Sequence, residues 1–300
     1  METAQTTQGN QDPKQEKQEN KQQTQKPAVT KDQKFRTELK LFQDNIIKLC
    51  QDTGMAPEKF MVIVENSVRK NPRLLDADRR SFFASILVAA EFGLEINGPL
   101  QQCFIIPYND KEKGILEAQF QFGYFGITHL MYRNPVITKV MSECRFSNDH
   151  FDRWIGDDMH WKFMFKPAED NDRGAFMGAF AIVHMKDTEP EFKYMSFAEL
   201  EAIRAKSKSP HMYDIKNDPQ RWMYRKATVR QISKLIPKDE LFGRAIAYDA
   251  AIDGGANLKL EDGKVTVINN NKPVDVKPTS EKLKTIFGKE KIEDAQQVDY

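Results

Sequence analysis

The stretch QQCFIIPYNDKEKGILEAQFQF, residues 101–122, contains two aromatic and apolar runs on either side of the charged segment NDKEKG. Runs of this length, separated by a turn that contains glycine, predict a β-hairpin. Between residues 35 and 92, by contrast, apolar residues recur at steps of three and four, which indicates amphipathic helices. The change of period at residue 101 therefore predicts an α+β protein whose N-terminal helices precede a twisted antiparallel sheet.

Three helices are expected before the hairpin. They cover residues 35–51, a segment that opens at Pro57 and ends before Pro72, and residues 76–92. Gly54 and Gly93 follow the first and the third of them, where glycine commonly ends a helix in the left-handed conformation. The N-terminal part of the chain is thus helical.

A second set of elements is expected after the hairpin. The helical period returns at residues 123–133, which we interpret as a helix that crosses the sheet. Alternating apolar residues then predict strands at 136–146, 159–165, 175–185 and 191–195. Helices follow at 197–206 and 218–236. Asp218 is suited to cap the last of these, Pro219 to begin it and Pro237 to end it.

The two ends of the chain have a different composition. Residues 1–34 are rich in Gln and Lys and have almost no large apolar side chains, which is typical of a disordered tail. Residues 251–300 include paired glycines, three consecutive asparagines and two prolines, and we expect a second flexible tail there. A single domain at 35–250 remains between them. Residues 281–287, EKLKTIF, form a short amphipathic segment that is a candidate for binding a partner.

Cysteine content and hydropathy indicate a cytoplasmic protein. The three cysteines lie in apolar segments, which favours buried thiols over a disulfide framework. The N-terminus lacks the apolar run of a signal peptide, and no apolar run is long enough to span a membrane. No cofactor is expected, and the absence of GxxxxGK[ST] argues against a P-loop NTPase.

Charge is unevenly distributed along the chain. The net charge is only +1, yet residues 204–244 carry eleven Lys and Arg against four Asp and Glu. A surplus of this kind in one segment favours a polyanion partner such as DNA.

The helix expected at 218–236 divides into two faces on a helical wheel. Val229, Ile232 and Ile236 share an apolar arc with Trp222 and would anchor the helix. A ridge of cations at four-residue steps lies on a neighbouring arc, where it would contact phosphates, unless it is only a solvated face. Its members are Lys226, Arg230 and Lys234. Arg225 falls inside the apolar arc, so it would reach either a groove edge or a buried partner.

Other segments offer weaker signals. Lys206 and Lys208 lie in a loop with hydroxyl groups and an aromatic ring, which suits contact with a DNA backbone or an ordinary turn. Two glycines in FGYFG, residues 122–126, allow either a phosphate or a neighbouring backbone to come close. Arg133 and Lys139 would extend the positive surface, with Tyr124 nearby. The acidic and histidine residues between 149 and 160 match no metal-binding motif, and a metal-dependent nuclease is kept only as an alternative.

Three stretches together resemble the RecT family of phage and prophage single-strand annealing proteins. They are GLEINGPLQQCFIIPY at 93–108, FGYFGITHLMYR at 122–133, and WMYRKATVR at 222–230 with LIP at 235–237. The order and spacing agree with the family over residues 55–245. Phe125 and Tyr132 stand where members often have basic residues, and an aromatic ring that stacks on bases is a substitute for a phosphate contact there.

The resemblance implies a function that composition does not give. Family members bind single-stranded DNA with its bases exposed and anneal it to a complementary strand without ATP and without a catalytic site. They assemble into rings or helical filaments, and a partner exonuclease and a host single-strand binding protein are expected partners. A passive single-strand binder is the other alternative. The residues that we expect to contact DNA are Lys206, Lys208, Arg225, Lys226, Arg230 and Lys234, followed by Arg133, Lys139 and Tyr124.

Overall fold

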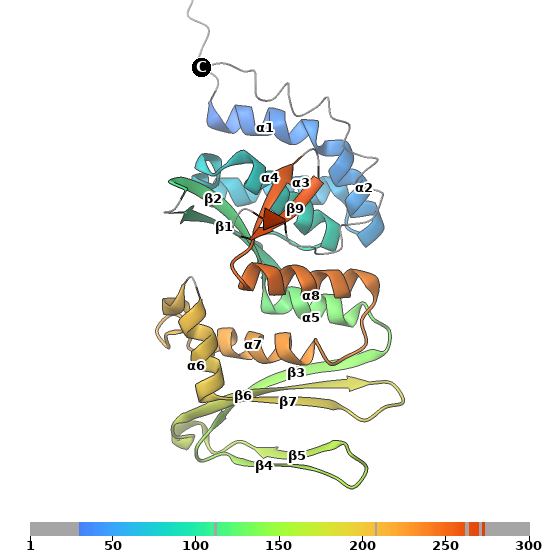
Figure 1. Ribbon diagram of the computed structural model, residues 1–300, viewed down its shortest axis with the longest axis vertical. Coiled ribbons are helices and arrows are strands. Elements are labelled where there is room, and N and C mark those ends of the chain that lie inside the picture. The colour runs from blue at the N-terminus through green and yellow to red at the C-terminus, as the bar shows by residue number, and fades with distance from the viewer. Residues whose placement is uncertain (1–29, 111–112, 208, 262–263, 270–271, 274–300) are drawn as a thin grey trace, which may run out of the picture.

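The structure is a computed structural model that describes residues 30–110, 113–207, 209–261, 264–269 and 272–273. Its elements form successive layers along the longest axis (Figure 1). The N-terminal helices and the first hairpin lie at one end, followed by helices α8 and α5, helix α7, a three-stranded sheet and, at the other end, a second hairpin. The expected α+β class is confirmed.

The N-terminal layer contains the three expected helices, one of them interrupted. Its elements are α1 (Lys31–Leu41), α2 (Gln43–Thr53), α3 (Pro57–Lys70), the 3-10 helix η1 (Pro72–Asp76) and α4 (Arg79–Phe92). The single helix expected at 35–51 is broken at Phe42, whose backbone leaves the helical range. Gly54 and Gly93 end α2 and α4 in the left-handed conformation, as expected.

All the strands of the described residues pair antiparallel, but they form several small sheets. The first hairpin joins β1 (Cys103–Asp110) to β2 (Ile115–Phe122). The central sheet has the order β3-β6-β7, from Ile137–Phe146, Phe176–Met185 and Glu191–Ser196. A second hairpin joins β4 (His150–Ile155) to β5 (Trp161–Lys166), and the last sheet contains β8 (Asn257–Glu261), β9 (Lys264–Asn269) and β10 (Lys272–Pro273).

The helices of the second half lie on one side of the central sheet, and α7 packs directly against it. They are α5 (Tyr124–Tyr132), α6 (Phe197–Lys206), the 3-10 helix η3 (Pro210–Tyr213), α7 (Trp222–Ile232) and α8 (Glu240–Asp253). Helix α7 lies across β3, β6 and β7, while the β4–β5 hairpin packs on the opposite face through Phe151, Phe163 and Phe165. No helix was expected at residues 240–253. The N-terminus of α8 does carry a cap signal, since the Asp239 carboxylate accepts the N–H of Phe242.

Helix α7 contributes to two apolar cores. Val229 and Ile232 are fully buried in the larger core, which includes the N-terminal helices, the first hairpin, α5 and α8. Tyr224 and Ala227, on another face of α7, belong to a smaller core with Leu200 of α6. The two halves of the molecule are therefore joined through the side chains of one helix.

Described structure extends into both segments that were expected to be tails. Residue Thr30 caps α1, so helical structure begins before residue 35. At the other end, Leu258, Leu260 and Val267 of β8 and β9 are buried in the larger core, so packed structure continues past residue 250. The segment 281–287 lies outside the described residues.

Two further expectations concern the cysteines and the membrane. All three cysteines are free and buried, as predicted, and burial raises the pKa of the Cys50 and Cys144 thiols to about 11. Within the described ranges, no helix combines the length and the apolar character that crossing a membrane requires.

Candidate nucleic-acid interface

Helix α7 is shorter at both ends than the segment 218–236 predicted from the sequence. It begins at Trp222, because Arg221 adopts a left-handed conformation with φ of 54°. Asp218 still serves the N-terminus, since its carboxylate accepts the backbone N–H groups of Trp222 at 2.9 Å and Met223 at 2.8 Å. The helix ends at Ile232, and a turn leads from there to Pro237.

The cationic ridge expected on α7 is not an open surface. The ammonium of Lys226 is buried, which lowers its pKa, and it donates a hydrogen bond to the backbone oxygen of Phe122. Arg230, whose side chain is 16% exposed, forms ion pairs with Asp249 and with Asp253, the latter at 3.0 Å. Only Lys234 is exposed. Two of the three ridge cations are therefore engaged within the protein, Arg230 by two carboxylates of α8 and Lys226 by the Phe122 carbonyl.

Ion pairing also reduces the basic surplus of residues 204–244. Arg204 pairs with Glu201 and Asp214, and Arg244 pairs with Glu91 at 3.1 Å. Together with Arg225 and Arg230, these arginines are held by carboxylates. The cations that remain exposed are mainly lysines, so the surface charge is smaller than the sequence suggested.

The helical wheel left two alternatives for Arg225, a groove edge or a buried partner, and the structure shows the buried partner. Its guanidinium donates to the backbone oxygen of Ser142 and to Glu143 Oε1 at 3.0 Å, both on β3. The same group lies over the ring of Trp222, 4.1 Å from its centroid. Arg225 thus fixes Trp222 against the central sheet.

Trp222 belongs to an aromatic cluster formed by Tyr124, Phe125 and Trp222. The Trp222 ring lies 5.0 Å from that of Tyr124 and 5.4 Å from that of Phe125, centroid to centroid. Phe125 is 41% exposed, so one ring of the cluster is open to solvent. Aromatic rings in this setting can stack on nucleobases without regard to sequence. Tyr124 was expected as a contact and stacking was considered at Phe125, but nothing in the residue spacing brings Trp222 of α7 beside these residues of α5.

The glycines of the FGYFG stretch serve backbone packing. A Cβ at Gly123 would lie 2.0 Å from the backbone oxygen of Gln101, and one at Gly126 would lie 2.0 Å from that of Gln102. These glycines let α5 pack on the chain that enters β1. Close packing, rather than approach to a phosphate, explains them in this structure.

The other predicted contact residues are spread over neighbouring elements. Lys139 is exposed on β3, Lys206 is exposed at the end of α6, and Arg133 is half-buried at the end of α5. Lys208 lies outside the described residues. Tyr132 is exposed as a ring, while its hydroxyl accepts the N–H of Val140 at 2.9 Å.

Several arginines that no sequence pattern indicated lie over aromatic rings near the central sheet. The guanidinium of Arg221 is 4.3 Å from the ring centroid of Phe176, and that of Arg173 is 4.4 Å from that of Phe146. Such contacts join residues that are distant in sequence, so no local pattern indicates them. They place flat, cationic surfaces beside the N-terminus of α7.

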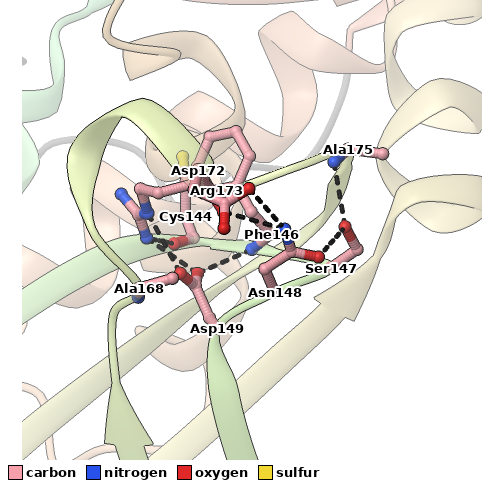
Figure 2. Close-up of polar contacts among 9 residues, drawn as sticks. All are labelled: Cys144, Phe146, Ser147, Asn148, Asp149, Ala168, Asp172, Arg173 and Ala175. Atoms are coloured by element: carbon pink, nitrogen blue, oxygen red, sulfur yellow. Dashed lines mark hydrogen bonds and ion pairs between the residues drawn. The ribbon is translucent and has the colours of Figure 1, made fainter.

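In the acidic and histidine-containing segment 149–160, the buried residue Asp149 has a structural role. Figure 2 shows that the Asp149 carboxylate accepts hydrogen bonds from Arg173 and from the N–H groups of Phe146 and Ala168. Burial opposes its ionisation, but the Arg173 hydrogen bonds hold the pKa of Asp149 below its usual value. The described residues contain no group of three or more such side chains placed to hold a metal ion, so the nuclease alternative gains no support.

Exposed cations and an aromatic cluster on adjoining elements are features that nucleic-acid-binding proteins use. The chain belongs to the RecT family, whose model matches residues 58–261. Protein RecT of Escherichia coli (strain K12) is 26% identical over 227 residues, which is 72% of this chain and 81% of that protein. The resemblance noted in the sequence is confirmed, and the chain is a DNA recombination and annealing protein.

Proposed function

We propose that the protein binds single-stranded DNA and anneals complementary strands in the cytoplasm without ATP and without a chemical step. The observation that carries this proposal is the aromatic cluster, held by Arg225 and exposed at Phe125. Stacking on such a cluster favours unpaired bases, because bases inside a duplex do not present their faces. Family membership supports annealing as the outcome of binding.

The free energy for annealing comes from base pairing itself. Two DNA strands repel each other through their phosphates, and cations that neutralise both backbones lower this barrier. Lys139, Lys206 and Lys234 are exposed and are proposed as backbone contacts, with Arg133 and Lys208 beside them. Arg225, Lys226 and Arg230, in contrast, are proposed to position the cluster and α7. No P-loop motif occurs in the sequence, which supports independence from ATP.

Assembly and partners extend the same proposal. A ring or helical filament of identical subunits would align the clusters of successive protomers along one strand. An exonuclease and a host single-strand binding protein are proposed partners. Mass photometry on long single strands tests assembly, and a strictly monomeric state would contradict it.

The experiment is an annealing assay with two complementary oligonucleotides, one carrying a fluorophore and the other a quencher. We expect the protein to accelerate quenching equally with and without ATP. Phe125→Ala should weaken binding about tenfold, since stacking contributes on the order of 1–3 kcal/mol per base. Trp154→Ala is the matched control, because Trp154 is also an exposed aromatic residue but lies on β4 at the far end of the molecule.

Two outcomes would contradict the proposal. Binding without faster annealing would identify a passive single-strand binder. Equal effects of Phe125→Ala and Trp154→Ala would remove the aromatic cluster as the binding surface.

A further inference from the structure

A cavity of about 640 Å³, wide open to solvent, lies where α6, η3 and the N-terminus of α7 meet. Figure 1 shows α6 beside the beginning of α7, at the end of the central sheet opposite to the turn that joins β6 to β7. Cavities of roughly 300–1,000 Å³ are the usual size of small-ligand sites. Nothing in the proposed annealing site uses this space.

The lining of the cavity is aromatic. Tyr213 and Tyr224 are buried and lie 5.1 Å apart between ring centroids, while Phe176 lies 5.2 Å from Tyr224. Phe197, the first residue of α6, is 47% exposed and lies 5.8 Å from Phe176. The rings of this lining come from four elements, and Phe197 is the exposed one on which a flat aromatic ligand can stack.

The charges around the cavity leave cations available. Its two acids, Glu201 and Asp214, are both paired with Arg204, and the Tyr224 hydroxyl donates to Glu201. Arg221 and Lys216 also line the cavity, and neither has an ion pair with any of the described residues. The lining thus combines aromatic rings with two cations that form no ion pair with a described carboxylate.

We propose that the cavity holds one unstacked nucleotide of a bound single strand, with its base against the aromatic rings and its phosphate at Arg221 and Lys216. The site rests on the proposed function and extends it. Arg221 directly precedes Trp222, so one strand can contact the aromatic cluster and enter the cavity within a short length. A base held there is withheld from the complementary strand and must leave the cavity before pairing is complete.

The test uses the full chain and an oligonucleotide that contains 5-iododeoxyuridine, which forms adducts with nearby aromatic residues on irradiation. We expect adducts on Phe176, Phe197, Tyr213 or Tyr224, located by mass spectrometry. Phe197→Ala should reduce these adducts and weaken binding about tenfold, as loss of one stacking contact does. Met212→Ala is the control, because Met212 is exposed on η3 beside the lining residue Tyr213 but does not itself line the cavity.

A second oligonucleotide of the same length, with abasic sites in place of bases, separates the contribution of the bases to binding from that of the phosphates. Phe197→Ala should not weaken binding of this abasic strand, whereas Arg221→Gln should weaken both strands and flatten the salt dependence by about 0.7 in slope. Adducts confined to Phe125 and Trp222, with Phe197→Ala binding as the wild type does, would overturn the cavity site and leave the proposed function intact. Failure of the wild type to bind single strands would overturn both.

Discussion

The ammonium group of Lys226, in α7, donates a hydrogen bond to the backbone oxygen of Phe122, the last residue of β2. This contact joins two residues that are 104 positions apart and fixes the junction from which α5 begins. Because α5 carries Tyr124 and Phe125, Lys226 supports the aromatic cluster through this contact. A cation that the sequence marks as a phosphate contact thus acts inside the protein.

Replacement of Lys226 should therefore affect stability more than charge-dependent binding. Lys226→Ala leaves the Phe122 oxygen without its donor and should lower the free energy of unfolding by roughly 1–3 kcal/mol. Lys234→Ala, at an exposed position, should change stability by less than about 0.5 kcal/mol and reduce the salt slope of DNA binding by about 0.7. Urea unfolding and salt titrations measure both. A flatter slope for Lys226→Ala at unchanged stability would contradict its internal role.

Gly126 should tolerate no side chain. In Gly126→Ala the new methyl group would lie 2.0 Å from the Gln102 backbone oxygen, so α5 must move away from the chain that enters β1. We expect a loss of roughly 3 kcal/mol or more in urea unfolding. Gly243→Ala is the control within α8, where no atom lies within 4 Å of the added carbon. That variant should gain roughly 0.5–1 kcal/mol, because alanine is the better helix former. Similar losses in both would refute the steric explanation.

Asp149 should stabilise the fold through its charge. Asp149→Asn weakens the contacts with Arg173 and with two backbone N–H groups, for an expected loss of roughly 2–4 kcal/mol. Because the pKa of the folded carboxyl is lowered, its contribution is present above the ordinary Asp pKa of about 3.9 and is lost as pH falls further. The wild type should lose more stability on acidification than the variant. Asp157→Asn, in the exposed turn, serves as the control.

Tyr224 should make stability fall at alkaline pH. Burial and the hydrogen bond to Glu201 raise its pKa to about 12, whereas an unfolded tyrosine titrates near about 10. The neutral phenol therefore stabilises the fold fully below pH 10 or so, and this contribution is lost as pH rises toward 12. Between pH 9 and 11 the wild type should lose on the order of 1 kcal/mol more than Tyr224→Phe in urea unfolding. Equal losses of unfolding free energy in the wild type and in Tyr224→Phe would contradict this role of Tyr224.

Truncation should distinguish the last sheet from the residues beyond it. Deletion of residues 255–300 removes Leu258, Leu260 and Val267 from the larger core and should lower the thermal midpoint by more than 10 °C or abolish folding, as roughly 3 kcal/mol or more would. Deletion of residues 274–300 leaves these side chains in place and should retain the wild-type midpoint. Pull-down of an exonuclease or single-strand binding protein with the shorter deletion then tests the segment 281–287. A stable protein lacking residues 255–300 would contradict the place of β8 and β9 in the core.

Local periodicity accounts for much of the fold. The helices of the N-terminal layer, the first hairpin and the strands of the central sheet follow from apolar spacing and from stop signals such as Gly54 and Gly93. The strand at 150–155, the helix at 240–253 and the strands at 257–261 and 264–269 were missed. The glycines and asparagines between residues 254 and 271 resemble a tail, and only burial against α4 and the first hairpin gives Leu258 and Val267 a core position.

The candidate site was harder to predict than the fold. The wheel correctly assigned Val229, Ile232 and Ile236 to a buried face. It could not show what covers the neighbouring arc, because Asp249 and Asp253 reach Arg230 from a helix that begins ten residues after it. Contacts such as Arg221 on Phe176 depend in the same way on which elements meet in three dimensions.

The placement of α7 between two cores affects how the protein responds to substitutions. Val229 and Ile232 hold the helix to one half of the molecule, and Tyr224 and Ala227 hold it to the other. Each half loses part of its core when α7 is released, so we expect the two halves to unfold in one cooperative transition. A substitution deep among the N-terminal helices would then weaken the central sheet as well as its own surroundings.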